Sequence, residues 1–196
     1  MEQLSFFSAE ASGPRLADLA GVLCGQGRIV SFGRTAARLS VPLTELWRAK
    51  VLAAEFARRG VHADVLRDEE GLLVRTAFRA DLIHLARAWQ PGEEKKPPPG
   101  FRLTGGALRM WALAAGQPNG NHYLLAVDED AGELLAGACR QLGLPAQCVG
   151  PRAGGPAVRV TGKRRLATLE ELIGAPPPAA VDVWPGFRPP VPETAA

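Results

Sequence analysis

An internal repeat constrains the fold most strongly, because two similar blocks of sequence predict two similar structural units. Residues 74–82 align with residues 158–166 at an offset of 84, and residues 60–63 align with residues 143–146 at an offset of 83. Offsets this constant over separate segments indicate that the second half of the chain repeats the elements of the first half. The 196 residues therefore contain two units of similar size.

Two proline-rich segments mark the ends of these units. Proline cannot continue a helix, and the charged stretch around residues 91–99 has the composition of a linker. The second proline-rich segment begins at Pro176. We therefore predict a first repeat at 1–90, a linker at 91–103, a second repeat at 104–175 and a Pro-rich tail at 176–196.

Each repeat shows the same alternation of helical and strand patterns. Apolar residues at helical spacing predict the helices, and alternating residues around short turns predict hairpins. In the first repeat, Thr44 is the expected N-cap of the best-defined helix, and Gly60 is its expected stop. Expected helices cover 14–24, 44–59, 81–89, 106–115, 128–142 and 163–173, and expected strands cover 28–32, 35–41, 61–66, 72–78, 122–127, 146–149 and 157–161. The predicted fold class is α+β, with two pseudo-symmetric α-β-β-α-β-β-α repeats and a shortened first hairpin in the second repeat.

The opening helix of each repeat carries a short motif. Residues 19–27, LAGVLCGQG, resemble the LAGLIDADG motif of homing endonucleases, and residues 108–116 hold the equivalent place in the second repeat. This resemblance implies a fold in which the first helices of the two repeats pack together along a pseudo-twofold axis. Small side chains on one helical face let two helix backbones approach closely. The spacing predicts helix packing between the repeats through Ala17, Gly21, Gly25, Ala112 and Gly116.

Catalytic acids are absent from both motifs. The resemblance implies one carboxylate at the end of each motif helix, and the pair would hold the divalent metal that cleaves the phosphodiester. Here Gln26 and Ala115 occupy those two positions. Asp18 lies eight residues before Gln26, which is about 12 Å along a helix and too far to substitute. We therefore expect no catalytic residue, no metal site, no cofactor and no DNA cleavage.

Several stretches of the chain are similar to the N-terminal region of the WhiA family of bacterial transcription regulators, which is tied to sporulation and cell division. They include residues 5–10, 16–27, 108–119, 139–148 and 169–175, so the similarity covers roughly residues 5–175. It implies a non-catalytic, DNA-binding transcription regulator. WhiA proteins continue into a helix-turn-helix domain, whereas the tail after residue 175 is too short and too rich in proline for one. We expect weak DNA binding, or binding assisted by a regulatory partner protein that carries the helix-turn-helix.

The distribution of charge indicates where DNA would bind. Residues 14–90 contain 12 basic and 8 acidic residues, whereas residues 104–175 contain 7 basic and 6 acidic residues. In LAGLIDADG proteins the concave face of the sheets lies over the duplex, so basic residues on strands and at their ends are candidates for phosphate contacts. Position and strand parity select Arg28, Arg34, Arg38, Arg75, Arg152, Arg159, Lys163 and Arg164. The alternative for each of these residues is an ordinary solvated side chain.

Composition excludes several other classes of function. No apolar run approaches the ~18–20 residues of a membrane span, and the N-terminus lacks the features of a signal peptide. Three scattered cysteines favour a reducing cytoplasm, where the protein would be free to associate with the nucleoid. We expect no membrane partner and no small-molecule substrate. One alternative stays open, a protein-interaction scaffold without direct DNA binding, whose sheet face would hold a partner protein. Separately, Trp184 in the tail is a docking anchor, part of ordinary packing or disordered.

Overall fold

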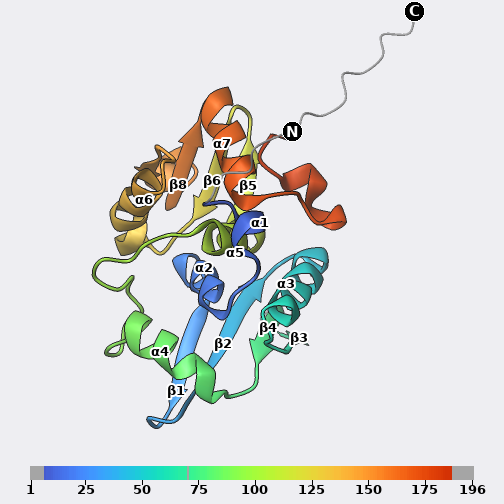
Figure 1. Ribbon diagram of the computed structural model, residues 1–196, viewed down its shortest axis with the longest axis vertical. Coiled ribbons are helices and arrows are strands. Elements are labelled where there is room, and N and C mark those ends of the chain that lie inside the picture. Colours follow the sequence, from blue (N-terminus) through green and yellow to red (C-terminus); the bar gives the residue numbers. More distant parts are fainter. Residues whose placement is uncertain (1–6, 70, 187–196) are drawn as a thin grey trace, which may run out of the picture.

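The computed structural model describes residues 7–69 and 71–186 and mixes helices with two separate sheets (Figure 1). The first two residues of the 5–10 segment and the last ten residues of the predicted tail lie outside the described part of the chain. Within the described part, no helix is both long enough and apolar enough to cross a membrane.

Each repeat contributes one four-stranded antiparallel sheet, and the two sheets share one strand order. The first sheet has the order β1-β2-β4-β3 and the second has the order β5-β6-β8-β7, so every strand has a counterpart. The strands are β1 (Arg28–Phe32), β2 (Ala36–Leu43), β3 (Ala63–Asp68), β4 (Gly71–Thr76), β5 (Gly116–Asn119), β6 (His122–Ala126), β7 (Gln147–Val149) and β8 (Ala157–Thr161). This arrangement confirms the predicted α+β fold of two repeats, including the short first hairpin of the second repeat.

Helices α2 to α7 follow the predicted order, with differences at their ends, whereas α1 was not predicted. They are α1 (Ala9–Ser12), α2 (Ala20–Cys24), α3 (Leu46–Arg58), α4 (Ile83–Trp89), α5 (Gly105–Ala115), α6 (Gly132–Gln141) and α7 (Lys163–Ile173). A 3₁₀ turn at Leu16–Leu19 precedes α2. The expected N-cap at Thr44 is wrong, because α3 begins at Leu46 after Glu45, and no side chain caps it.

Side chains alternate along the strands and give each sheet a buried face and a second face, called the outer face below. In β2, Leu39 and Val41 are fully buried, whereas Arg38 and Ser40, which alternate with them, are half-buried. Helices α3 and α4 pack on the first sheet, and α5, α6 and α7 pack on the second. The outer faces are therefore the sides of the sheets turned away from the helices.

Helices α2 and α5 lie side by side at the centre of the molecule, between the two sheets (Figure 1). Their close approach depends on glycine, because a Cβ atom at Gly21 would overlap the carbonyl group of Ala107. A Cβ atom at Gly25 would lie 3.1 Å from the Cβ atom of Ala115. Ala17 is exposed on the preceding 3₁₀ turn. Gly21 in α2 and Gly25 at its C-terminal end thus form the contact surface toward the second repeat.

Gly116, at the end of α5, serves a different contact from the one predicted for it. A Cβ atom at Gly116 would overlap the hydroxyl oxygen of Tyr123 and the backbone of Ala112, both in the same repeat. Ala112 is itself buried in α5. Gly116 therefore lets the end of α5 pack against its own sheet.

The ends of the described chain pack onto the repeats. Helix α1 contacts α5 and α7, both in the second repeat. After α7, a 3₁₀ turn at Pro178–Val183 contacts α3 and β5. Trp184 follows it, is buried, and donates a hydrogen bond from Nε1 to the carbonyl of Gly174 at 2.9 Å. Of the alternatives for Trp184, the structure shows ordinary packing within the chain.

Candidate nucleic-acid interface

The end of α2 is held by a lysine from the linker. Lys95 Nζ donates hydrogen bonds to the backbone carbonyls of Leu23, Gly25 and Gly27 at 2.8, 2.5 and 3.0 Å. It also forms an ion pair with Asp128 at 2.8 Å, and its side chain is only 8% exposed. Burial lowers the pKa of the Lys95 amine, and the hydrogen bond to Asp128 opposes this shift. The last carbonyls of a helix carry partial negative charge, so a buried ammonium group satisfies them well.

The end of α5 is held in an equivalent way by an arginine. Arg48, on α3 of the first repeat, donates to the carbonyls of Ala112 and Leu113 at 3.3 and 2.7 Å. It also donates to the carbonyl of Gly116 at 3.1 Å. In the motif alignment, Ala112 and Gly116 are the counterparts of Leu23 and Gly27. The same two carbonyl positions of each repeat therefore bind a buried cation of the chain itself.

These two cations bind backbone at the helix ends where the motif of a LAGLIDADG nuclease would carry its carboxylates. The two positions hold Gln26, which is exposed, and Ala115, which is half-buried, and neither side chain is an acid. The nearby Asp128 is engaged by Lys95 and, at 3.3 Å, by Arg28. A divalent cation would meet two positive side chains and one already paired carboxylate at this place, which opposes its binding. Across the described residues, no group of three or more His, Cys, Asp or Glu side chains is arranged to hold a metal.

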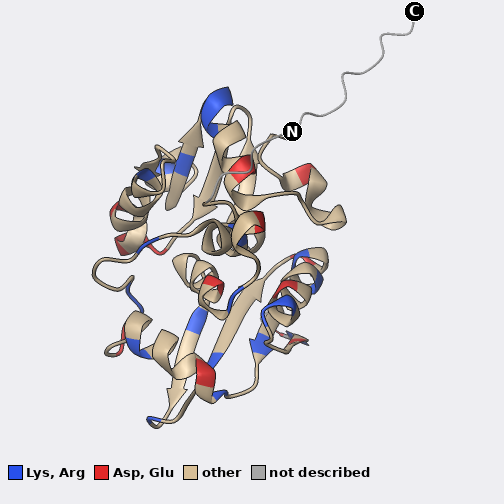
Figure 2. Ribbon diagram, in the orientation of Figure 1, with Lys and Arg blue, Asp and Glu red and all other residues tan. Residues whose placement is uncertain are grey.

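The outer face of the first sheet brings several predicted residues together. Strand register places Arg28 opposite Ser40, Val30 opposite Arg38, and Arg75 opposite Ser40 on its other side. Residues directly opposite each other share a face, so Arg28, Arg38 and Arg75 all lie on the outer face. Figure 2 shows blue, basic segments on the strands of this sheet.

The outer face of the second sheet is covered instead. Leu124, Val149 and Ala157 lie on it and form a small buried apolar cluster, separate from the main core. The loop of residues 150–156 folds over them, so that a Cβ atom at Gly154 would lie 3.3 Å from Cδ1 of Leu124.

The remaining candidates lie apart from the open face. Arg159 is half-buried on the covered face, with a buried Nε that has no hydrogen-bond partner. Arg34 is exposed in the turn between β1 and β2, and Arg152 is exposed in the 150–156 loop. Lys163 and Arg164 are exposed in the first turn of α7. The structure thus gathers three of the eight candidates on one open surface.

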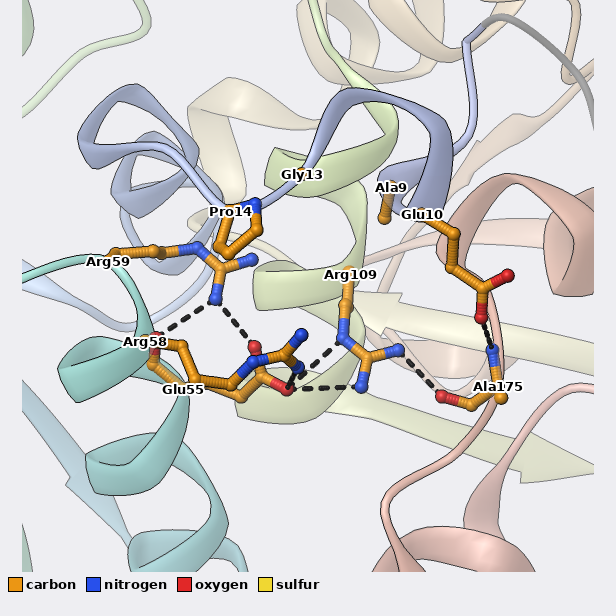
Figure 3. Close-up of a pocket in the computed structure, with 9 residues that line it drawn as sticks. All are labelled: Ala9, Glu10, Gly13, Pro14, Glu55, Arg58, Arg59, Arg109 and Ala175. Carbon is orange, nitrogen blue, oxygen red and sulfur yellow. Dashed lines mark hydrogen bonds and ion pairs between the residues drawn. The ribbon is translucent and has the colours of Figure 1, made fainter.

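Sequence reasoning missed a buried ionic network between the repeats (Figure 3). Arg59 Nε lies 3.1 Å from Asp18, and its Nη1 bonds Glu55. Glu55 also accepts from Arg109 of α5 at 3.1 Å and from Arg58 at 3.0 Å. Glu55 and its three arginine partners border a cavity of about 240 Å³ between α1 and α3.

The same network ties α5 to the end of α7. Arg109 Nη1 donates to the carbonyls of Ile173 and Ala175 at 2.9 and 2.7 Å, and the guanidinium lies 5.4 Å from the ring of Trp184. Burial by itself would raise the pKa of Glu55, but hydrogen bonds from Arg59 and Arg109 outweigh it and lower that pKa. The one available sequence signal was Arg109 itself, the single charged residue of an otherwise apolar helix.

Two solved structures share this architecture. The homing endonuclease I-WcaI, bound to its DNA recognition sequence, aligns with a TM-score of 0.57 at 12% identity, over 88% of this chain and 83% of that chain. The N-terminal LAGLIDADG domain of DUF199/WhiA aligns with a TM-score of 0.52 at 9% identity, over 82% of this chain and 81% of that chain. The chain has the LAGLIDADG homing-endonuclease-like fold. At these identities the likeness establishes the fold alone.

Sequence comparison adds no family. No protein-family model matches the chain, and no curated protein matches it.

Proposed function

We propose that this protein is a non-catalytic, DNA-binding regulator that uses the LAGLIDADG-like fold for recognition, in the manner of a WhiA-type transcription regulator. Lys95 and Arg48 carry the proposal, because they fill the ends of both motif helices with positive charge. A metal-dependent nuclease needs negative charge and open coordination positions there. In this proposal the protein acts in the cytoplasm on the nucleoid, and a separate helix-turn-helix protein adds further DNA contacts.

The open outer face of the first sheet supports binding without cleavage. Arg28, Arg38 and Arg75 lie there together, and the Arg28 side chain is 52% exposed. Three such residues suit contacts to phosphates, which position a protein on DNA without chemistry. This modest number agrees with weak intrinsic affinity.

The lack of nuclease activity is tested directly. Purified protein is incubated with supercoiled plasmid and 10 mM magnesium or manganese, and nicked and linear products are followed on a gel. We expect no product beyond that of the protein-free control. Protein-dependent cleavage that disappears with EDTA would contradict the proposal.

DNA binding is tested by fluorescence anisotropy with a labelled duplex. Three phosphate contacts give a slope of about −2.7 in log affinity against log salt, so the affinity falls about 40-fold between 50 and 200 mM salt. Arg38→Glu combined with Arg75→Glu is expected to abolish this binding. Lys50→Glu is the matched control, because Lys50 is exposed on α3, which covers the opposite side of the sheet. No binding at 50 mM salt, or equal binding by both variants, would contradict direct DNA recognition.

A further inference from the structure

We propose that the outer face of the first sheet binds single-stranded nucleic acid, with Phe32 and Phe78 stacking on unpaired bases beside the arginines. This inference rests on the proposed function and narrows its ligand to strands whose bases are accessible. Duplex DNA hides the faces of its bases in the stack, whereas a single strand offers them to aromatic side chains.

An exposed aromatic pair marks the far end of this face. Phe32 is 68% exposed and Phe78 is 42% exposed, and their ring centroids lie 5.6 Å apart with a tilt of 52°. Val30, two residues before Phe32 on the same face, is 39% exposed. Large apolar side chains gathered on an open surface mark an interaction site more often than they serve the fold.

Positive charge lies among these rings. The Arg38 guanidinium sits 4.6 Å from the centroid of Phe78, in a cation–π arrangement. Arg28 is four residues before Phe32 on the same strand, about 13 Å away. Arg75 lies on β4 across Ser40. A ligand along β1 therefore meets aromatic rings at one end and guanidinium groups along its length.

Charge on this face favours a polyanion over an apolar protein partner. Two carboxylates oppose these three arginines. Asp64 on β3 is opposite Arg75 and within 3.2 Å of the ring of His62, and Asp128 pairs with Arg28 at 3.3 Å. A nucleic-acid strand supplies negative charge and flat apolar rings together, which matches both features of the surface.

The second sheet explains why a single strand fits better than a duplex. A duplex lying across both repeats requires two open outer faces. Here the 150–156 loop covers the second face, and Leu124 beneath it is 3% exposed. A single strand needs one sheet alone, and one sheet is open.

The experiment measures anisotropy of labelled 12-mers at 50 mM salt: oligo-dT, oligo-rU and a mixed-sequence duplex. We expect the protein to bind the single strands more tightly than the duplex, and the two single-strand arms distinguish DNA from RNA. Phe32→Ala and Phe78→Ala are expected to weaken single-strand binding by about 5-fold or more. Leu134→Ala, which removes an exposed apolar side chain from α6, is the matched control and is expected to change nothing.

Phe32→Trp keeps a stacking surface and is expected to retain the wild-type affinity, which separates stacking from a structural effect. Two results together would overturn this inference and leave the proposed function intact: salt-dependent duplex binding at least as tight as single-strand binding, and a single-strand affinity of Phe32→Ala within twofold of wild type. No binding of any oligonucleotide would overturn both, and would leave protein docking as the use of the aromatic pair.

Discussion

Two arginines donate to the same oxygen of Glu55 at nearly the same distance, which makes a controlled test of burial. Arg109 Nη2 lies 3.1 Å from Glu55 Oε1, and Arg58 Nη1 lies 3.0 Å from it. The Arg109 side chain is 10% exposed, whereas that of Arg58 is 59% exposed. If burial decides the contribution of an ion pair, replacement of these arginines by methionine will have unequal effects.

The expected magnitudes follow from what each substitution leaves behind. Arg109→Met leaves a buried carboxylate with one fewer partner and the carbonyls of Ile173 and Ala175 without a donor. Removing one partner of a buried ion pair costs about 3–5 kcal/mol. Arg58→Met removes a solvent-screened pair, for which about 0.2–1 kcal/mol is typical.

Urea denaturation followed by tryptophan fluorescence measures both variants. Arg109→Met is expected to lower the midpoint with little change in the m-value, and to lower Tm by roughly 6–20 °C for a chain of this size. Arg58→Met is expected to remain within about 1 kcal/mol of wild type. Equal destabilisation by the two variants would refute the reasoning from burial. So would an Arg109→Met variant as stable as the wild type.

Three further predictions concern the centre of the molecule. Because the pKa of Glu55 is lowered in the folded protein, the Glu55 carboxylate contributes its full stabilisation above about pH 4.3. That contribution is lost as the pH falls through the folded-state pKa. The free energy of unfolding of Glu55→Gln should therefore vary less below pH 4.5 than that of wild type. Gly21→Ala should prevent folding or lower Tm sharply in circular dichroism. Gly137→Ala on α6, where a Cβ would meet Arg140 Nη2 at an ordinary contact distance of 3.7 Å, should raise stability by about 0.5–1 kcal/mol. Lys95→Met should cost about 2–5 kcal/mol in urea denaturation, because three carbonyls lose their donor, and a cost below 1 kcal/mol would show that water replaces the ammonium.

Local patterns carry most of the fold. The range expected for α7, 163–173, matches the structure, and the seven strands with an expected range differ from it by at most a few residues at their ends, whereas β5 had no expected range. These elements are set by side-chain periodicity and by turn residues next to them in the chain. The wrong N-cap prediction at Thr44 has the same origin. Thr44 is an acceptable capping residue, and it stands one position before Glu45, the N-cap in the structure.

The candidate site was only partly predictable, because its decisive contacts join distant residues. Strand parity placed Arg38 on an open face correctly. Lys95 belongs to a charged linker and has no local feature that distinguishes it from a solvated lysine, and its carbonyl partners lie about seventy residues earlier. The covered state of Arg159 likewise depends on how a distant loop folds back over the sheet.

Lys95 also shows that the connection between the repeats is held in place by specific contacts rather than being a loose linker. Trp89 fixes the beginning of the connecting stretch, since its carbonyl accepts from the backbone of Lys96 at 2.8 Å and its ring packs edge-on against Phe101 at 5.0 Å. Lys95 pins the same stretch to α2. The connection between Trp89 and Lys95 is thus held at a fixed length by contacts at both ends. Extra residues inserted before Lys95 would move the ammonium away from its carbonyls, whereas residues inserted within 97–100 would not. Carbonyls at the end of α2 bind Lys95 of the connection, and carbonyls at the end of α5 bind Arg48 of the first repeat, so the two halves are complementary parts rather than interchangeable copies.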